Sequence, residues 1–357
     1  MTAEVENYLE EIIGEIDFSA LNEFFNSHMR LKLDFGELVS QISLHGLEAL
    51  NKENVTTFVF DSVFYELSVA RPIFIKMLVF SLLFSIVHRL LVTKNKYISD
   101  IGFLVIYTIL MVLLMQSFFI VKEIALEGVD ALLLFLNALI PTYAATMVFS
   151  GSAVTGAMIY ELAFFIVYLV EFVMKNLLSP IIHLFILILF LNHLFDEDKL
   201  SKLAEFIEIG VGLLLKGAFG IVLGLSVVQS LLAPAKDRLA GNMILSGISA
   251  IPGIGNVMGS AGEIILSCGM LIKNSVGVIG LIILFVMAIV PVLKIACFWI
   301  MYYLISILLQ PVADARITEC VSGVARGCDL YLKMIVYSMM LFFVLFSMIT
   351  VATSFFV

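Results

Sequence analysis

The stretch IGFLVIYTILMVLLMQSFFIV, residues 101–121, contains no Asp, Glu, Lys or Arg. A helix of roughly 20 apolar residues crosses the hydrocarbon core of a bilayer, so this run predicts a transmembrane helix. Eight charge-free runs of this kind occur along the chain: 101–121, 131–160, 176–195, 217–235, 239–262, 274–293, 295–313 and 334–357. They lack the alternation of outer-membrane barrel strands. The sequence therefore predicts an all-α polytopic membrane protein.

Composition and charge divide the chain into two parts. Of its 357 residues, 62% are apolar and 14% are charged, and the mean hydropathy is +1.11. Soluble domains carry about 25% charged residues, so a soluble enzyme, a nucleic-acid-binding module and a disordered chain are excluded. The net charge of −9 lies entirely within residues 1–72, because residues 73–357 are charge-balanced. We expect an acidic, amphipathic-helical extramembrane segment over 1–72 and a transmembrane domain over 73–357.

The start of the chain and the acidic segment carry two local signals. Met1–Glu4 lacks the basic and apolar regions of a signal peptide. Asp34 followed by Glu37 predicts the start of a helix within the acidic segment.

Prolines and glycines divide the longest apolar runs. The run 131–160 is too long for one span, and Pro141 and Gly151 mark the places where we expect it to break. Dividing the body in this way predicts about eight to ten membrane helices. The ten candidate elements are 73–92, 101–121, 131–149, 155–174, 177–195, 210–233, 242–262, 265–286, 288–310 and 331–356.

The same breakers suggest an internal repeat. At an offset of 111 residues, Pro141 corresponds to Pro252, Gly151 to Gly262, and Pro180 to Pro291. Two four-element units are predicted, 101–195 and 212–306, with 331–356 as a final helix outside them. A chance alignment of two apolar regions is the alternative. Apolar composition alone does not place helix breakers, which favours a true repeat.

The two Ile-Pro elements are the least helix-like part of the body. The second contains Pro252 followed by four glycines: Gly253, Gly255, Gly259 and Gly262. Non-helical backbone at membrane depth survives only where it is buried in protein or lines water, so both elements are predicted to be broken or re-entrant. Small-residue helix packing is the alternative. If the two Ile-Pro elements turn back within the membrane, the two repeats are inverted; if both elements cross it, the repeats are parallel. The distribution of Lys and Arg between the loops on the two sides favours inverted repeats.

Ionisable residues inside apolar spans are candidates for function, because a charge at the bilayer centre costs at least about 2.5–3.5 kcal/mol. Five residues meet this criterion: Glu161, Lys216, Glu263, Lys273 and Lys294. They form either a polar pathway or structural ion pairs. Glu171 and Lys175 make an ordinary (i, i+4) surface pair. The four cysteines and five histidines show no metal-ligand spacing, so no metal and no cofactor is predicted.

Several motifs of the C-terminal half together resemble one known family. They are 251–256 (IPGIGN), 259–263 (GSAGE), 271–277 (LIKNSVG), 291–294 (PVLK) and 309–316 (LQPVADAR). This pattern resembles the stage III sporulation protein AE family over about 210–330.

The resemblance implies a multi-pass protein of an endospore-forming bacterium, in the mother-cell membrane around the forespore, with its N-terminal segment on the extracytoplasmic side. It also implies partners from the same operon, namely a secretion-type ATPase and ring-forming proteins that build a mother-cell–forespore channel for late forespore development.

Three functions remain open at the level of sequence. The first is a non-enzymatic, permease-like subunit of that channel complex, in contact with the bilayer and not with nucleic acid. The second is a stand-alone secondary transporter with a midplane site at the Ile-Pro elements. The third is a purely structural membrane scaffold for the complex.

Overall fold

A computed structural model describes residues 3–28, 34–46, 71–72, 74–87, 96–150, 153–194, 199–249 and 255–354. All regular elements within these ranges are helices, which confirms the all-α class. By length and composition, five of the helical stretches could cross a membrane: Asp100–Phe149, Glu161–Asn192, Ser201–Leu225, Leu266–Leu309 and Ala315–Ser347. The chain is therefore a multi-pass membrane protein.

The helices are of two kinds. Three short ones form the N-terminal part: α1 (Ala3–Glu15), α2 (Ser19–His28) and α3 (Phe35–His45). A short apolar helix follows at Phe74–Val87. The long elements of the body are α5 (Lys96–Phe149), α6 (Ala153–Glu171), η2 (Phe172–Leu178), α7 (Ser179–Leu194), α8 (Ser201–Ser249), α9 (Gly255–Leu309) and α10 (Ala315–Ser354).

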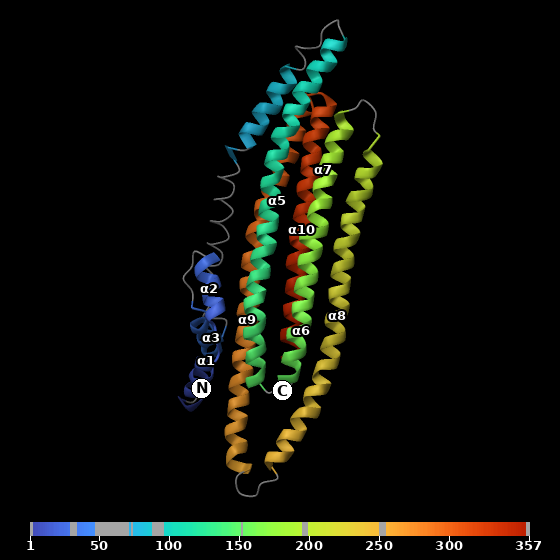
Figure 1. Cartoon of the computed structure of the whole chain (residues 1–357). Helices are drawn as coiled ribbons and strands as arrows, with labels where there is room; N and C mark the ends of the chain where they lie inside the picture. The colour runs from blue at the N-terminus through green and yellow to red at the C-terminus, as the bar shows by residue number, and fades with distance from the viewer. Residues whose placement is uncertain are drawn as a thin grey trace.

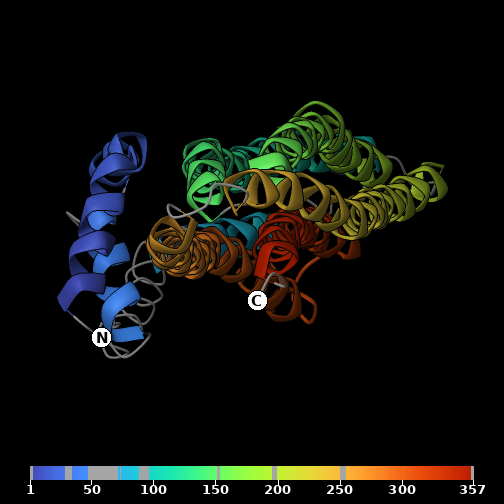
Figure 2. The same ribbon diagram turned by 90° about the horizontal axis from the view of Figure 1, so that it is seen from below.

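The long helices run up and down in an elongated bundle (Figure 1). α5, α8 and α10 run in one direction, and the α6–η2–α7 rod and α9 run in the other. α10 lies inside the bundle, against α5, α7, α8 and α9. Figure 2 shows the same bundle in cross-section, with α8 at one edge and the N-terminal helices beside α9 at the opposite edge. A helix of 55 residues such as α9 is about 80 Å long, well above the ~30 Å of a hydrocarbon core.

Polar contacts hold the start of α8 against the end of α7, and they cap the start of α3. The Asn192 side chain accepts the Leu200 amide at 2.7 Å and donates to the Ser201 hydroxyl at 3.0 Å, which ties the end of α7 to the start of α8. Asp34 accepts the amides of Gly36 and Glu37, so it caps α3 and confirms the helix start predicted there.

The predicted division into ten elements is wrong in one respect, because consecutive elements join into single helices. α5 contains both 101–121 and 131–149 and continues through Pro141. α9 contains 265–286 and all but the last residue of 288–310, and it continues through Pro291. Proline is tolerated in apolar helices where hydroxyls and neighbouring helices replace the lost backbone bond. Thr142 donates to the Ala138 carbonyl at 3.1 Å beside Pro141. The first Ile-Pro element is therefore neither broken nor re-entrant.

Pro180 does accompany an irregularity. The π-helical segment η2 ends directly before α7, and the Ser179 amide donates to the Met174 carbonyl, five residues back. Because Pro180 has no N–H, it cannot bond to the carbonyl four residues before it. The wider helical turns of η2 lie immediately before that position.

The internal repeat is not confirmed. The hairpin of α5 with α6–η2–α7 and the hairpin of α8 with α9 both start at the same end of the bundle and return to it (Figure 1). An inverted pair would run in opposite directions. Pro141 lies inside α5. Its counterpart Pro252, together with Gly253, lies outside the described residues, so the 111-residue register stays a prediction. Gly151 also lies outside them. Gly255 begins α9, and Gly259 and Gly262 lie within it.

The N-terminal helices lie against the bundle. Phe24 and Phe25 approach Phe135 of α5, with ring centroids 5.6 and 6.5 Å apart, and the hydroxyl of Ser43 donates to that of Ser275 in α9 at 2.9 Å. On this side α5 and α9 therefore contact protein. The extramembrane location of 1–72 and the domain boundary at residue 72 stay predictions.

Candidate functional site

The structure does not gather the predicted intramembrane charges into one cluster. Glu161 of α6 and Lys216 of α8 are exposed and form no ion pair with any described residue. Lys294 is half-buried on α9, one turn after Pro291, and Lys273 of α9 is only 2% exposed. The side chain of Glu263 lies outside the described part of the chain.

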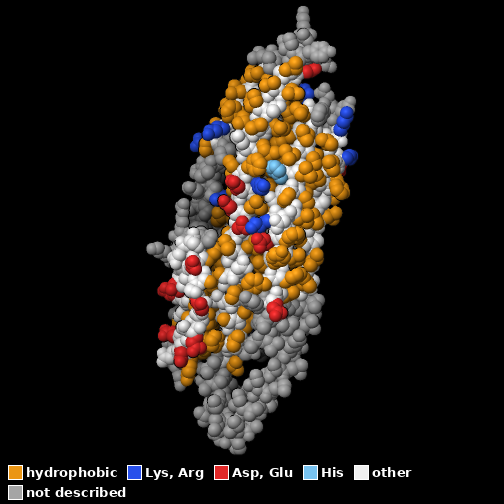
Figure 3. Space-filling view, viewed as in Figure 1, with side chains coloured by type: hydrophobic (Ala, Val, Ile, Leu, Met, Phe, Trp, Pro, Cys, Tyr) orange, Lys and Arg blue, Asp and Glu red, His pale blue; other side chains and the backbone are white. Residues whose placement is uncertain are grey.

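Charged side chains instead lie on several helices near the middle of the bundle. In Figure 3 acidic and basic groups gather at mid-height, with apolar surface above and below them. We call this set the mid-height belt. Its members are Lys122, Glu123, Glu127, Asp130, Glu171, Lys175, Glu208, Lys216, Arg326, Asp329 and Lys333. In α5 the belt residues separate the two charge-free runs 101–121 and 131–149.

The best-connected member of the belt is Lys175, on the π-helical segment η2. Its ammonium group lies 2.5 Å from an Asp130 oxygen of α5 and 3.4 Å from Glu171, one turn earlier. Lys175 and the two carboxylates are each about one-third to two-fifths exposed. The ion pair with Asp130 joins two helices. Lys175 therefore makes an interhelical contact in addition to the (i, i+4) surface pair with Glu171 that the sequence predicts. π-helical turns are frequent at functional sites.

A second interhelical ion pair lies on the other side of the bundle. Arg326 of α10 donates to Glu208 of α8, and its guanidinium lies 5.4 Å from the Phe185 ring centroid of α7. Arg326 thereby connects three helices. Lys333, two turns further along α10, pairs with Asp329 at 2.5 Å. These pairs offset the cost of placing charges within an apolar bundle.

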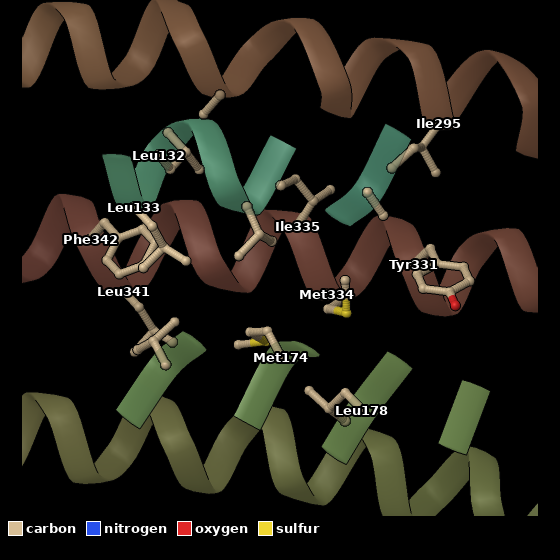
Figure 4. Close-up of a cluster of buried hydrophobic side chains, with 14 of the residues drawn as sticks. Leu132, Leu133, Met174, Leu178, Ile295, Tyr331, Met334, Ile335, Leu341 and Phe342 are labelled. Atoms are coloured by element: carbon tan, nitrogen blue, oxygen red, sulfur yellow. The ribbon is translucent and has the colours of Figure 1, made fainter. Parts of the chain in front are cut away.

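Neutral polar contacts continue the belt into the interior. Tyr331 of α10 donates to the Ser179 carbonyl at 3.3 Å and lies 3.3 Å from its hydroxyl. Tyr302 of α9 donates to the hydroxyl of Ser117 in α5. In Figure 4, α10 passes between η2 on one side and α5 and α9 on the other, and its side chains pack against both. The labelled residues are Leu132, Leu133, Met174, Leu178, Ile295, Tyr331, Met334, Ile335, Leu341 and Phe342.

His183 of α7 is the least satisfied polar residue near the belt. Its Nδ1 atom is buried and has no hydrogen-bond partner among the described residues. Its ring lies 5.1 Å from the ring of Phe119 in α5. No group of three His, Cys, Asp or Glu in the described part of the chain could hold a metal ion.

Glycines bring the helices close together around the belt. A Cβ atom at Gly128 of α5 would lie 2.8 Å from the Pro291 Cβ, and one at Gly327 of α10 would collide with Ile186 of α7. Gly323 faces Leu189 one turn before Gly327, which gives the small-xxx-small spacing of closely packed membrane helices. The breaker Pro291 is therefore a packing element.

Lys273 lies away from the belt, on a face of α9 that also carries Gly269 and Gly277, one turn before and one turn after it. A Cβ at Gly269 would collide with the Phe149 carbonyl at the end of α5, and one at Gly277 would lie 2.5 Å from Thr350 of α10. Lys273 therefore lies on the face of α9 that packs against the end of α5 and the last turns of α10.

Sequence reasoning missed the acidic and basic partners that make the belt: Asp130, Glu208, Arg326, Asp329 and Lys333. One signal could have indicated them, because each lies at or near the junction between two consecutive apolar runs. Their pairing across helices is visible only in three dimensions.

Comparison with known proteins identifies the family. The sequence profile of the stage III sporulation protein AE family matches residues 33–353. The chain belongs to the stage III sporulation protein AE family. One relative is the stage III sporulation protein AE of Bacillus subtilis (strain 168), which is 24% identical over 358 residues, covering 97% of this chain and 88% of the relative. No solved structure matches the chain.

Family membership gives this multi-pass membrane protein a role in sporulation. The family name denotes a sporulation protein and no enzymatic activity, in agreement with the prediction of a non-enzyme. The resemblance inferred from the C-terminal motifs is thereby confirmed, and it extends over most of the chain.

Proposed function

We propose that the chain is a permease-like, non-enzymatic subunit of a transport or channel complex that links the mother cell to the forespore and is required for late forespore development. It works in the mother-cell membrane around the forespore, with its N-terminal segment on the extracytoplasmic side. Its partners are other stage III membrane proteins of the same operon, including a secretion-type ATPase and ring-forming proteins.

One observation supports this proposal above the others. The mid-height belt places charges from α5, η2, α8 and α10 within one band near the middle of an apolar bundle. Ionisable groups at membrane depth carry a cost, and they mark pathways for ions or substrates in many membrane proteins. The pair of Lys175 and Asp130, beside a π-helical segment, is the part of the belt best placed to rearrange.

The scaffold alternative has a specific observation in its favour, because the interhelical pairs of the belt also hold helices together. The stand-alone transporter is less well supported, since its predicted site depended on two broken Ile-Pro elements and α5 is continuous through the first. Uptake of a small molecule by proteoliposomes that contain only this chain would favour the transporter.

The test uses the full-length gene in an endospore-forming host that lacks its own copy. Asp130→Asn and Lys175→Met remove one charge each, and Asp130→Lys combined with Lys175→Asp exchanges the two charges. Lys202→Met is the matched control, because Lys202 and Glu205 form an exposed pair on one helix. Protein level and recovery with ring-forming partners report assembly. A late forespore reporter and heat-resistant spores report transport.

We expect the single variants to assemble normally and to lose reporter activity and spores, with no recovery in the exchanged variant. A pathway depends on which helix carries each charge. Recovery of the reporter in the exchanged variant would instead assign the pair a structural role. Normal sporulation in both single variants would overturn the proposal, and loss of assembly would support the scaffold.

A further inference from the structure

The outer face of α8 has no partner in the described part of the chain. α8 is the least buried of the five membrane-crossing stretches. Its large apolar side chains Phe206 and Leu213 are 72% and 65% exposed, and Ile209 and Ile221 are more than half exposed. The spacings of three, four and eight residues keep these side chains on one face of the helix, where they form a stripe.

Lys216 lies in the middle of this apolar stripe. It is exposed and makes no ion pair with any described residue. Around it the stripe is flat, because no described atom lies within 4 Å of a Cβ placed at Gly217, Gly220 or Gly224. Another helix could therefore approach α8 closely at this level. A cation that has no ion-pair partner among the described residues, on an apolar, membrane-crossing face, calls for an acidic partner.

The chain itself carries the complementary charges. Glu123 and Glu127 are exposed on the outer face of α5 and form no ion pair with any described residue. The same face carries Phe119 and Leu134, both more than two-fifths exposed, and the exposed amides Gln116 and Asn137. α5 and α8 run in the same direction through the bundle (Figure 1).

Lys216 and the two glutamates lie at the same depth. Glu208 of α8 pairs with Arg326 of α10, and Gly327, the next residue of α10, faces Phe118 of α5. Glu208 and Phe118 therefore share a level. Lys216 lies eight residues beyond Glu208, or about 12 Å further along the axis, and Glu127 lies nine residues beyond Phe118, or about 13.5 Å.

We propose that α8 of one copy of this chain packs against the outer face of α5 of a second copy, with Lys216 paired to Glu123 and Glu127. Copies in one membrane share orientation and depth, so charges at equal depth on two different faces can meet between neighbours. The contact is heterologous, because it joins two different surfaces. It therefore builds a ring or a row of copies. The inference does not depend on what the assembly transports.

Disulfide cross-linking between two tagged full-length copies in one membrane tests the contact. One copy carries Ile209→Cys and the other carries Phe119→Cys, because each position lies one residue beyond the matched level of Glu208 and Phe118. Cys297, the one native cysteine that is not buried, is replaced by serine in both copies. The control pairs Ile209→Cys with Leu134→Cys, which is similarly exposed and roughly 20 Å deeper.

We expect a mixed disulfide dimer with Phe119→Cys and little with Leu134→Cys. Lys216→Glu on the first copy should lower the yield about tenfold, the scale of a single polar contact between membrane helices. Glu123→Lys and Glu127→Lys on the second copy should then restore it. Lys216→Gln, which removes the charge without reversing it, should give an intermediate yield.

Two outcomes would overturn the proposal. Equal yields with Phe119→Cys and Leu134→Cys would mean that the copies meet by random collision. An unchanged yield with Lys216→Glu, in protein that melts at the wild-type temperature, would mean that Lys216 faces lipid or another protein. If Lys216→Glu lowers the melting temperature, the second copy with Glu123→Lys and Glu127→Lys decides between misfolding and a lost contact. A restored disulfide yield supports the contact, because a neighbour cannot rescue a misfolded copy, and an unrestored yield contradicts it.

Discussion

Gly128 of α5 faces the ring of Pro291 in α9, and a Cβ atom at position 128 would lie 2.8 Å from the Pro291 Cβ and 3.1 Å from the Ile335 side chain of α10. Three helices therefore meet at one glycine within the mid-height belt. The contact explains why a proline can lie inside α9 without breaking the bundle. Its ring occupies the space that the missing side chain leaves on α5.

Gly128→Ala should destabilise the protein by about 1–3 kcal/mol, because an added methyl group must displace the proline ring or the isoleucine. Thermal unfolding in detergent measures the change. Gly212→Ala is the control, since nothing lies within 4 Å of the added Cβ there. It should be neutral or slightly stabilising, because alanine favours a helix. Equal melting temperatures for the two variants would contradict the close contact.

Tyr331→Phe should lower stability by about 1 kcal/mol and increase hydrogen exchange in η2, because the hydroxyl donates to the Ser179 carbonyl at the junction of η2 and α7. Tyr303→Phe on the exposed side of α9 is the matched control and should change neither quantity. Unchanged exchange in η2 with Tyr331→Phe would mean that the hydroxyl does not stabilise this junction.

Phe25→Ala should release the N-terminal helices from the bundle. The ring is fully buried between Phe35 of α3 and Phe135 of α5, and removing such a side chain costs about 3–5 kcal/mol. Faster hydrogen exchange over α1–α3, with α5 protected as before, would report the release. Asn26→Ala, an exposed neighbour on α2, should leave the exchange unchanged. Normal protection in the Phe25 variant would show that other contacts hold these helices.

Lowering the pH should loosen the start of α2. The Ser19 side chain and the Ser19 amide, the latter at 2.9 Å, donate to the Asp17 carboxylate, and these hydrogen bonds lower the pKa of Asp17 from its ordinary value of 3.8. A lowered pKa in the folded state adds stability above the ordinary value, and that stability is lost as the pH falls through the folded value. Protection of the Ser19 amide should therefore decrease below pH 3.8. Asp17→Asn should remove this dependence while keeping an acceptor.

The sequence determined the helical class, the membrane environment and the family. Charge-free runs such as 101–121 are long enough to cross a bilayer and cannot form a soluble surface, and this holds whatever the helices pack against. The N-cap of α3 was also predictable, because Asp34 and Glu37 act within one turn. These properties depend on local composition and spacing.

Only the tertiary structure decided where the helices break and which charges meet. Pro141 and Pro291 have the local signature of a breaker, yet nearby hydroxyls and close neighbours such as Gly128 let both helices continue. Glu161 and Lys216 had the strongest sequence signal of an intramembrane charge and lie exposed. Asp130 and Glu208 had a weaker signal and pair across helices. Pairing depends on contacts between residues far apart in the chain, and these are fixed by the packing of whole helices.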